Sequence, residues 1–558
     1  MPHPLAIALI KKSLIMKTRI IYVCLMIGLC SFSGLYAQNI RIIPNPRELV
    51  PGQGTFTLSQ QTRILASAES QSTAIFLQSY LEDLSGLQNA IVESEKAAGD
   101  LIQFKLDNRL AREAYELIVA QHGIQIIASN NTGWFYGAQS LIQLFPVLSH
   151  LSKGNSSVEI PAVTIKDAPR FPWRAFMLDE ARYFKGMEQV KMLLDEMALL
   201  KMNVFHWHLT DDQGWRIEIN KYPRLTQIGS RRKSTQVGSW GSPVQSAEEH
   251  AGFYTQEEIK EIVEYARDRQ IHIVPEIEMP GHSSAAIASY SWLGTAKEEI
   301  EVPIVFGVGT DVYDVSDPRV IQFLRDVLDE VMLLFPSEVI HIGGDEVRYD
   351  HWKSSPSVQA FMKEKQLETP ADLQLYFTNS ISQYLHSKGR RMMGWNEIMG
   401  HNVHEYQDEN DTRSDRELAK GSIVHFWKGD LKLATQAASA GYEIVNSLHS
   451  ETYLDYSYES IPLSRAYAFD PVPKKLNPEY HDKIIGSGCQ MWGEWIPTRG
   501  HMHFQVFPRL AAYAEVGWTE KNRKDFDGFK TALLKLKTRW ENRGIYYAPD
   551  SVVLKGSD

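Results

Sequence analysis

The chain has almost no cysteine, and most of what it has lies in one N-terminal segment. Of the 558 residues, 3 are cysteine; Cys24 lies in the first apolar run and Cys30 directly follows that run. A chain processed after that run keeps Cys489 alone, which excludes an internal disulfide. Because Cys489 lies in an apolar stretch with no histidine beside it, we expect a small core residue rather than a nucleophile.

A basic excess is also missing, and so are long apolar runs beyond the N-terminus. The net charge of −10 is not the basic balance expected of a nucleic-acid-binding protein. No later stretch is long and apolar enough for a stable membrane span. The apolar fraction of 43% and the charged fraction of 23% are typical of a globular protein. A chain of this length predicts about two or three domains.

The N-terminal segment has the pattern of a secretory signal. Lys17 and Arg19 precede the apolar run from Ile20 to Leu29, and a small residue, Ala37, offers a cleavage point. We therefore predict a signal peptide over residues 1–37, with Met16 as the alternative start. The same pattern predicts an exported protein that is periplasmic, attached to the cell surface or secreted.

Two domains are expected after the signal. Residues 38–168 combine alternating strand patterns with helical runs and carry no chemical constellation, so we predict a small α+β supporting domain. From residue 169 to residue 558, strand and helix patterns alternate, which predicts an α/β fold: a (β/α)₈ TIM-type barrel with a short C-terminal tail. The eight predicted strands cover residues 173–179, 203–209, 271–279, 338–344, 391–395, 422–427, 442–447 and 484–492.

The helices between these strands are signalled unevenly. Thr255 with Glu258 forms a capping-box pattern, and Asp317 precedes a proline at the first helical position. The helices after the fifth and seventh strands are weakly marked, so we expect a partly irregular barrel. The predicted helices cover residues 187–202, 255–270, 318–335, 371–388, 432–440 and 504–516.

Side chains suited to a sugar follow the predicted strands. The fourth strand ends in two glycines and the pair Asp345-Glu346. In a barrel of this type, catalytic groups lie at the C-terminal ends of the strands. Aromatic faces pack against the C–H face of a sugar ring, while carboxylates bind its hydroxyls, so the pattern predicts a carbohydrate site. The other strand ends carry Asp179, Asp211, Glu278, His282, Trp395, Trp427, Trp492 and Glu494.

The two adjacent carboxylates need separate roles. Neighbouring residues on a strand point to opposite sides, so Asp345 and Glu346 are not expected to face each other across one glycosidic bond. We expect one of them to address another part of the substrate.

The run from His341 to Glu346, with the other strand-end motifs in the same order, resembles the glycoside hydrolase family 20 β-N-acetylhexosaminidases. Residues 38–168 are similar to that family's N-terminal domain. The resemblance implies removal of a terminal, non-reducing, β-linked N-acetylhexosamine (GlcNAc or GalNAc) with retention, without a cofactor or metal. The substrate's own acetamido oxygen would attack the anomeric carbon and form an oxazolinium intermediate.

The resemblance also implies individual roles. Glu346 would act as general acid and then as base, and Asp345 would orient the acetamido group. Glu278 departs from the family, which often has aspartate there, and this puts its contact with Asp345 in doubt. The remaining implied roles are Tyr453 as a donor to the acetamido oxygen; Arg174, Asp455 and Glu494 on sugar hydroxyls; Trp395, Trp427 and Trp492 as pocket walls; Asp211 and His282 as supports for Glu346 and Arg174; and Tyr467 on the leaving-group side.

Alternatives remain for several of these residues. His206 and His208 lie on one face of a predicted strand, as two ligands of a metal-dependent amidohydrolase would. A non-catalytic carbohydrate-binding protein on the same scaffold is a second alternative. Arg174 could instead anchor a loop through an ion pair, and Trp207 is expected to be a core residue.

Overall fold

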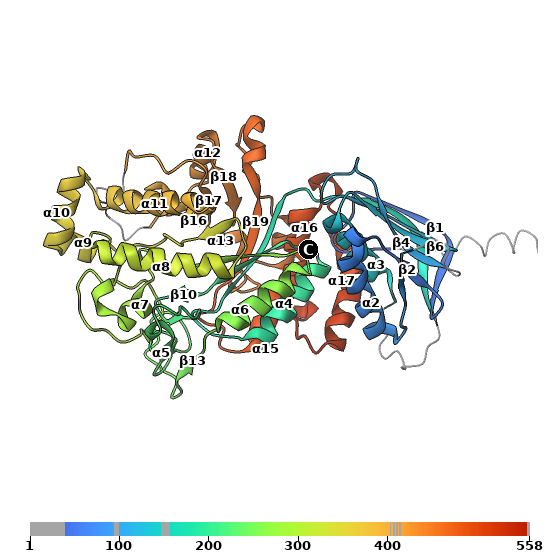
Figure 1. Cartoon of the computed structure of the whole chain (residues 1–558), viewed down its shortest axis with the longest axis horizontal. Coiled ribbons are helices and arrows are strands. Elements are labelled where there is room, and N and C mark those ends of the chain that lie inside the picture. The colour runs from blue at the N-terminus through green and yellow to red at the C-terminus, as the bar shows by residue number, and fades with distance from the viewer. Residues whose placement is uncertain are drawn as a thin grey trace, which may run out of the picture.

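The computed structural model describes residues 40–93, 100–146, 157–401, 403–404, 408, 411 and 414–554. The signal-peptide prediction for residues 1–37 lies outside these ranges. The described residues form a sheet domain beside a closed barrel (Figure 1). Among the helices of this described part, none is long and apolar enough to cross a membrane.

The N-terminal domain is a mixed seven-stranded sheet in the order β1-β7-β5-β6-β4-β2-β3. Burial alternates along β5 and β6, which form the expected antiparallel hairpin. Helix α3 begins after Asn130, whose side chain accepts hydrogen bonds from two backbone amides of the first turn. The elements are β1 (Glu48–Ser59), β2 (Arg63–Leu65), η1 (Ala68–Ser70), α2 (Gln71–Ser85), β3 (Ile91–Val92), β4 (Leu101–Leu106), β5 (Tyr115–Ala120), β6 (Gly123–Ala128), α3 (Asn131–Leu144) and β7 (Ser157–Asp167).

The barrel is closed and parallel, which confirms the predicted fold class. Its last strand pairs with its first, and all eight predicted strands are present, several of them shorter than expected. The strands are β8 (Trp173–Asp179), β9 (Val204–His208), β14 (His272–Glu276), β15 (Val339–His341), β16 (Arg391–Trp395), β17 (Ile423–Phe426), β18 (Glu443–Asn446) and β19 (Ile484–Met491).

Helices surround the barrel, and the irregular places are those expected. The capping box at Thr255 and the cap at Asp317 are both present. Among the described residues, short elements take the place of a full helix after β16 and β18. The elements are α4 (Met187–Leu199), α6 (Gln256–Arg267), α8 (Pro318–Leu334), α9 (Asp350–Ser354), α10 (Pro356–Lys365), α11 (Pro370–Ser387), η3 (Asn396–Met399), α12 (Leu431–Ser439), α13 (His449–Thr452), α14 (Leu463–Ala468), η4 (Pro478–Lys483), α15 (Arg499–Val506) and α16 (Arg509–Trp518).

The longest insertions follow the second and third strands. They carry β10 (Thr210–Asp211), β11 (Gly214–Trp215), α5 (Arg224–Gln227), β12 (Arg231–Arg232) and β13 (His250–Ala251), and then α7 (Ser284–Ser289) and η2 (Ser291–Leu293).

The barrel interior changes in character along its axis, because alternate residues of each strand point inward. An apolar layer lies near the strand starts, and a layer with His206, His341 and His425 follows it. Aromatic residues form the next layer, among them Trp395, Tyr453 and Trp492. The polar and aromatic layers therefore lie toward the C-terminal ends of the strands. The apolar layer consists of Ala175, Val204, Val274, Val339, Met393, Ile423 and Val445.

The residues after the barrel are more than the short tail we expected. Helix α17 (Phe526–Asn542) lies between the two domains (Figure 1), and α18 (Asp550–Val553) follows it. Trp540 of α17 donates to the Glu196 carboxylate of α4 at 2.9 Å, and Arg539 donates to the Tyr80 hydroxyl of the sheet domain at 2.7 Å. This helix therefore joins the barrel to the N-terminal domain.

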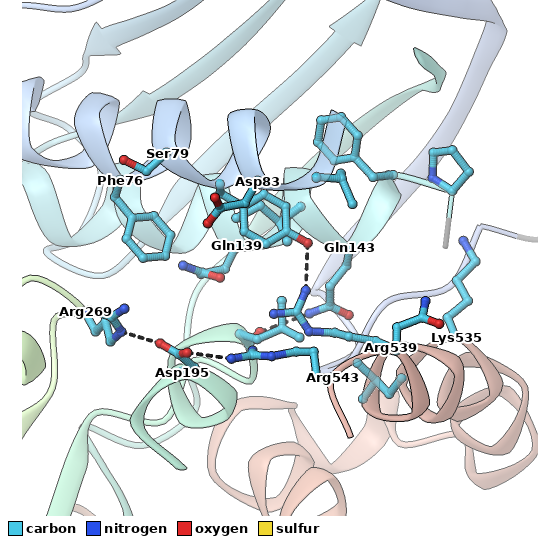
Figure 2. Close-up of a pocket in the computed structure, with 18 of the residues that line it drawn as sticks. Phe76, Ser79, Asp83, Gln139, Gln143, Asp195, Arg269, Lys535, Arg539 and Arg543 are labelled. Carbon is cyan, nitrogen blue, oxygen red and sulfur yellow. Dashed lines mark hydrogen bonds and ion pairs between the residues drawn. The ribbon is translucent and has the colours of Figure 1, made fainter. Parts of the chain in front are cut away.

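A cavity of about 1250 Å³ lies at this domain boundary (Figure 2). Its lining includes Asp195, which accepts hydrogen bonds at 2.7 Å from both Arg269 and Arg543. The lining residues come from helices of the sheet domain and from α4, α6 and α17, so the cavity is separate from the strand ends that carry the predicted site.

Candidate active site

The Asp345-Glu346 pair lies in a loop, not on a strand. Strand β15 stops at His341, and Gly343, Gly344 and Glu346 adopt left-handed backbone angles with φ of 66°, 89° and 50°. The expectation that the two carboxylates point to opposite sides is therefore wrong, because it assumed extended backbone. Both face one imidazole: Nε2 of His282 lies 3.7 Å from Oδ2 of Asp345 and 3.6 Å from Oε2 of Glu346.

Gly343 is required by space as well as by its backbone angle. A Cβ atom at this position would lie 1.8 Å from Oε2 of Glu278. Glu278, the residue that departs from the family pattern, is thus packed directly against the loop that carries the two carboxylates. The larger carboxylate leaves no room for any side chain at residue 343.

His282 is held from behind by two aspartates. Its Nδ1 lies 3.2 Å from Oδ1 of Asp211 and 3.2 Å from Oδ2 of Asp212. Asp211 in turn contacts Arg182 at 2.8 Å and Nε2 of His208 at 2.9 Å. The structure therefore places Asp211 and His282 where a support for Glu346 should be.

Burial and charge set the protonation of this group. Burial alone would lower the pKa of His282, but the neighbouring Asp211, Asp212 and Glu346 raise it well above its ordinary range. Burial would raise the pKa of Glu346, yet its ion pair with the His282 imidazolium lowers that pKa overall. Burial raises the pKa of Asp345 well above its usual value, and the Glu397 and Glu346 charges add to this. In the absence of substrate, Glu346 is thus the carboxyl group that is more readily ionised, and Asp345 is the one that is more readily protonated.

A second histidine, His404, approaches Glu346, and no sequence pattern marks it. Nδ1 of His404 lies 3.5 Å from Oε1 of Glu346, while its Nε2 lies 2.9 Å from Oε1 of Glu397. The ammonium of Lys428 is 3.2 Å from the same Nδ1 of His404. A lone histidine in a polar loop carries no strand-end signal, which is why it was missed.

Aromatic side chains come together in one cluster at the C-terminal ends of the strands. The rings of Trp427 and Tyr453 are parallel, with centroids 6.1 Å apart and an interplanar angle of 4°. Trp492 lies 5.9 Å from both Trp395 and Tyr453. Burial raises the pKa of Tyr453 well above its ordinary value, so its hydroxyl stays a hydrogen-bond donor at neutral pH. The predicted pocket walls therefore do come together.

Two further predicted residues, Asp455 and Glu494, lie near the same pocket. Burial raises the pKa of Asp455 well above its usual value, and the charge of Glu494 raises it further. Burial also raises the pKa of Glu494, which Arg182 opposes. The Oδ1 atom of Asp455 is buried and accepts no hydrogen bond from the described residues. Unpaired buried carboxylate oxygen is costly, so this oxygen suits a hydroxyl-bearing ligand.

Arg174 is not in the site, and that prediction is wrong. It lies at the start of β8, at the opposite end of the barrel from the carboxylates. There it binds Glu113 at 2.9 Å and the Tyr136 hydroxyl at 3.0 Å, both in the sheet domain. Arg182, just beyond the end of the same strand, occupies the site instead: it contacts Asp179 and Asp211 and lies over the Trp492 ring at 5.2 Å.

Tyr467 also lies elsewhere, so its placement on the leaving-group side is wrong. Its hydroxyl accepts a 2.7 Å hydrogen bond from the Asp525 amide, and its ring packs against Phe526 and Phe529 at the start of α17. Trp207 is fully buried against Tyr254, which confirms its expected place in the core.

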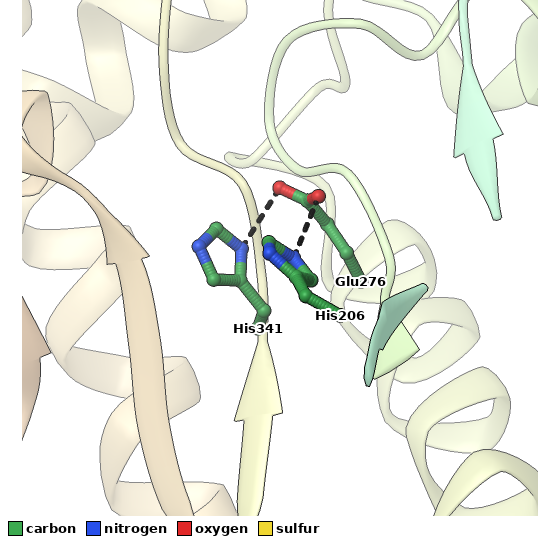
Figure 3. A group of neighbouring side chains, drawn as sticks. All are labelled: His206, Glu276 and His341. Atoms are coloured by element: carbon green, nitrogen blue, oxygen red, sulfur yellow. Dashed lines mark ion pairs between the residues drawn. The ribbon is translucent and has the colours of Figure 1, made fainter. Parts of the chain in front are cut away.

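His206, Glu276 and His341 form a buried group below the aromatic layer (Figure 3). Glu276 lies 2.9 Å from Nε2 of His206 and 2.8 Å from Nδ1 of His341. These donor types could hold a cation, but Glu276 also contacts His208 at 2.5 Å and accepts from Nε1 of Trp395 at 2.8 Å. The carboxylate oxygens of Glu276 are thus already paired with donors of the protein itself.

Comparison with known proteins agrees with this geometry. The model for "Glycosyl hydrolase family 20, catalytic domain" matches residues 171–521, and the model for "Glycosyl hydrolase family 20, domain 2" matches residues 39–168. The chain belongs to glycosyl hydrolase family 20. The resemblance seen in the sequence is thereby confirmed, and the sheet domain corresponds to domain 2 of this family.

Individual family 20 relatives cover most of this chain. It is 36% identical to a β-hexosaminidase of Porphyromonas gingivalis. The match covers 92% of this chain and 65% of that relative, so the chain spans slightly less than two thirds of the relative's length. It is 34% identical to a β-hexosaminidase of Vibrio furnissii over 87% and 77% of the two chains.

Solved structures of the family share the fold. The exo-β-N-acetylglucosaminidase of Vibrio harveyi, in complex with N-acetylglucosamine, has a TM-score of 0.78 at 30% identity, over 92% of this chain and 79% of that one. The β-N-acetylhexosaminidase of Bacteroides fragilis has a TM-score of 0.75 at 29% identity, over 91% and 97%.

Proposed function

We propose that this protein removes a terminal, non-reducing, β-linked N-acetylhexosamine from a glycan by substrate-assisted catalysis with retention. The observation that carries the proposal is the convergence of Asp345 and Glu346 on the His282 imidazolium beside a pocket of tryptophan and tyrosine rings. The named activities of its family 20 relatives support the same reaction class.

The first step breaks the glycosidic bond. The carbonyl oxygen of the 2-acetamido group attacks the anomeric carbon as the bond to the leaving oxygen breaks, and Glu346 gives its proton to that oxygen. Substrate entry displaces water from Glu346, which favours its protonated form despite the nearby imidazolium. The leaving group departs with the proton, and a cyclic oxazolinium ion remains.

Asp345 and Tyr453 act on the acetamido group. Asp345, whose pKa burial raises in the absence of substrate, accepts the N–H of the acetamido group in its ionised form, which the positive charge that grows on the oxazolinium ring favours. The Tyr453 hydroxyl donates to the acetamido oxygen and so fixes its direction of attack. Burial makes both interactions stronger than they would be in water.

The second step restores the enzyme. Glu346, now a carboxylate, takes a proton from water, and the water oxygen attacks the anomeric carbon on the face that the leaving group left. The oxazolinium ring opens to the acetamide, and the product keeps the β configuration. Arg182, Asp455 and Glu494 would hold hydroxyls of the sugar through both steps, with Arg182 in the role first expected of Arg174.

Activity on two matched substrates tests this proposal. An aryl β-N-acetylglucosaminide should be hydrolysed, while the aryl β-glucoside, which lacks the acetamido nucleophile, should be essentially inert. Equal rates on both substrates would refute substrate assistance. Hydrolysis that requires zinc and is abolished by a chelator would instead favour the amidohydrolase alternative.

A leaving-group series tests the role of Glu346. Glu346→Gln should lower kcat by on the order of 10² to 10⁴, as removal of a general acid does, and by less when the leaving group is a good one. A penalty that does not change with the leaving group would contradict the assignment.

Export is a further part of the proposal. The signal pattern of residues 1–37 favours a periplasmic, surface or secreted enzyme that meets glycans outside the cytoplasm. Cell fractionation with an antibody to the protein tests this, and activity confined to the cytoplasm would contradict it.

A further inference from the structure

Trp240 stands out among the tryptophans because it is 62% exposed. It lies near the tip of a small hairpin in the insertion between β12 and β13. The Val237 amide donates to the Val244 carbonyl at 3.0 Å, and Gly238 and Gly241 take left-handed angles with φ of 104° and 76°. The hairpin therefore fixes an indole in solvent, where burial would normally be favoured.

Hydrogen bonds tie this hairpin to a second loop. The amide of Gln236 donates to the Ile304 carbonyl at 2.7 Å, and the side chain of Gln236 accepts from the Phe306 amide at 3.0 Å. The next residue back, Val305, is 47% exposed, and its carbonyl accepts from the Gln213 amide group at 3.1 Å. Two separate loops thus present apolar side chains side by side.

The same loops meet the wall of the active-site pocket. The ring of Trp495 lies 5.3 Å from Trp240 and 5.1 Å from Phe306, both in edge-to-face contact. Trp495 directly follows Glu494, a predicted sugar-binding residue whose pKa burial raises and the charge of Arg182 lowers. The set Trp240, Val305, Phe306 and Trp495, here called the rim platform, therefore meets the predicted sugar-binding residues at Trp495.

Gln213 links the platform to the same pocket a second time. Its Oε1 accepts from Nε of Arg182 at 3.1 Å, while its amide group holds Val305. In addition, the Gly309 amide donates to Asp212, which contacts His282. The platform is therefore held in a fixed position relative to the reacting centre, as a substrate-binding surface should be.

We propose that the rim platform binds a sugar ring of the glycan that lies outside the pocket, with Trp240 as the stacking face. The inference rests on the proposed function: removal of a terminal sugar leaves the rest of the chain to pass over the rim. An exposed apolar patch beside a pocket marks a binding surface, and an edge-to-face contact leaves at least one indole face free for the C–H face of a pyranose. The platform thereby sets a preference for longer glycans over short aryl glycosides.

Steady-state kinetics on paired substrates test the platform. The probes are 4-nitrophenyl β-N-acetylglucosaminide and the β-1,4-linked GlcNAc dimer, trimer and tetramer. Trp240→Ala should lower kcat/KM on the best oligosaccharide by about three- to tenfold, the range for loss of one aromatic contact, and mainly through KM. The aryl glycoside should lose much less, and Trp240→Phe should recover part of the loss.

Tyr546 supplies a matched control. It is also an exposed aromatic residue, at 56%, and also packs on a second ring, that of Phe504, but it lies outside the rim. Tyr546→Ala should leave the ratio of oligosaccharide to aryl activity unchanged. An equal loss on both substrate types in Trp240→Ala, or no loss on any, would overturn the proposal.

Two other outcomes are decisive. If Trp240→Ala changes the oligomeric state in size-exclusion chromatography, the platform is a contact between copies and the proposal fails. If the wild-type protein hydrolyses none of the probes, the proposed function fails. Calorimetric titration of wild type and Trp240→Ala with the GlcNAc tetramer then decides the platform by itself, since equal affinities would contradict it.

Discussion

Arg174 and Arg182 lie eight positions apart, at opposite ends of strand β8, and their surroundings differ completely. Arg174 binds Glu113 and Tyr136 of the sheet domain, and its guanidinium lies 5.1 Å from the Trp518 ring. Arg182 is surrounded by Asp179 and Asp211, whose charges, with that of Glu494, raise its pKa well above the ordinary range despite burial. The comparison shows that, in this barrel, the end of the strand decides whether a buried arginine serves stability or substrate binding.

The largest effect is expected at the C-terminal end. Arg182→Met should lower kcat/KM on the aryl N-acetylglucosaminide by about 10² or more, because loss of one partner of a buried charge pair costs about 2–5 kcal/mol. The free energy of unfolding should fall as well, because Asp179 and Asp211 lose a buried partner, so the activity is measured per folded molecule. Arg182→Lys keeps the charge and should recover part of the activity. If Arg182→Met is as active as the wild-type protein, Arg182 does not bind the sugar.

The opposite result is expected at the other end. Arg174→Met leaves Glu113 without its buried partner, so the free energy of unfolding should fall by about 3–5 kcal/mol. Urea unfolding measures this fall. Activity per folded molecule should stay near the wild-type value. A loss of sugar affinity in the folded variant would show that Arg174 does contribute to substrate binding.

Gly343 offers a smaller and more specific test. Gly343→Ala places a Cβ against Glu278 at a left-handed backbone position, which should cost about 1–3 kcal/mol and reduce activity. The double variant Gly343→Ala with Glu278→Asp has a shorter carboxylate and should recover part of the loss. If the double variant is no more active and no more stable than Gly343→Ala alone, crowding by Glu278 is not the cause of the loss.

The charge on His282 should appear in the pH profile. The imidazolium lowers the pKa of Glu346, and a general acid works only while protonated, so the basic limb of kcat/KM follows that pKa. His282→Asn removes the cation, which raises the pKa and moves this limb to higher pH, while the maximal rate falls. If the basic limb stays in place or moves to lower pH in this variant, the charge of His282 does not lower the pKa of Glu346.

The smallest effect belongs to Tyr467. Tyr467→Phe removes one hydrogen bond to the Asp525 amide and should lower the free energy of unfolding by about 1 kcal/mol. KM should stay unchanged for aryl and oligosaccharide substrates alike. A raised KM for either substrate type would show that Tyr467 does contact the leaving-group side of the substrate.

Much of the fold could be predicted from the sequence, because each element has a local cause. Buried parallel strands give short apolar runs, and the caps at Thr255 and Asp317 mark helix starts through their own hydrogen bonds. Helix α17 was not expected, since the reason for it lies in distant partners such as Glu196 and Tyr80. A sequence pattern does not show such contacts.

Only those site residues could be predicted that follow a strand end or match a motif of the family. Trp395, Trp427, Tyr453 and Trp492 come together as expected, but the Asp345-Glu346 loop required left-handed backbone that a strand pattern does not reveal. Arg182 takes the place expected of Arg174 because it follows the C-terminal end of β8, where it contacts Asp211, whereas Arg174 lies at the start of the strand and contacts Glu113.

The most direct test of substrate assistance uses three aryl β-glucosaminides whose N-acyl group is acetyl, monofluoroacetyl or trifluoroacetyl. Fluorine withdraws electrons from the carbonyl oxygen, so an enzyme that uses this oxygen as nucleophile must slow steeply along the series. Substrate assistance predicts that kcat/KM falls from acetyl to trifluoroacetyl in wild-type protein, with retained configuration in the product. A rate that does not depend on fluorination would contradict it and show that a side chain or water attacks the anomeric carbon instead.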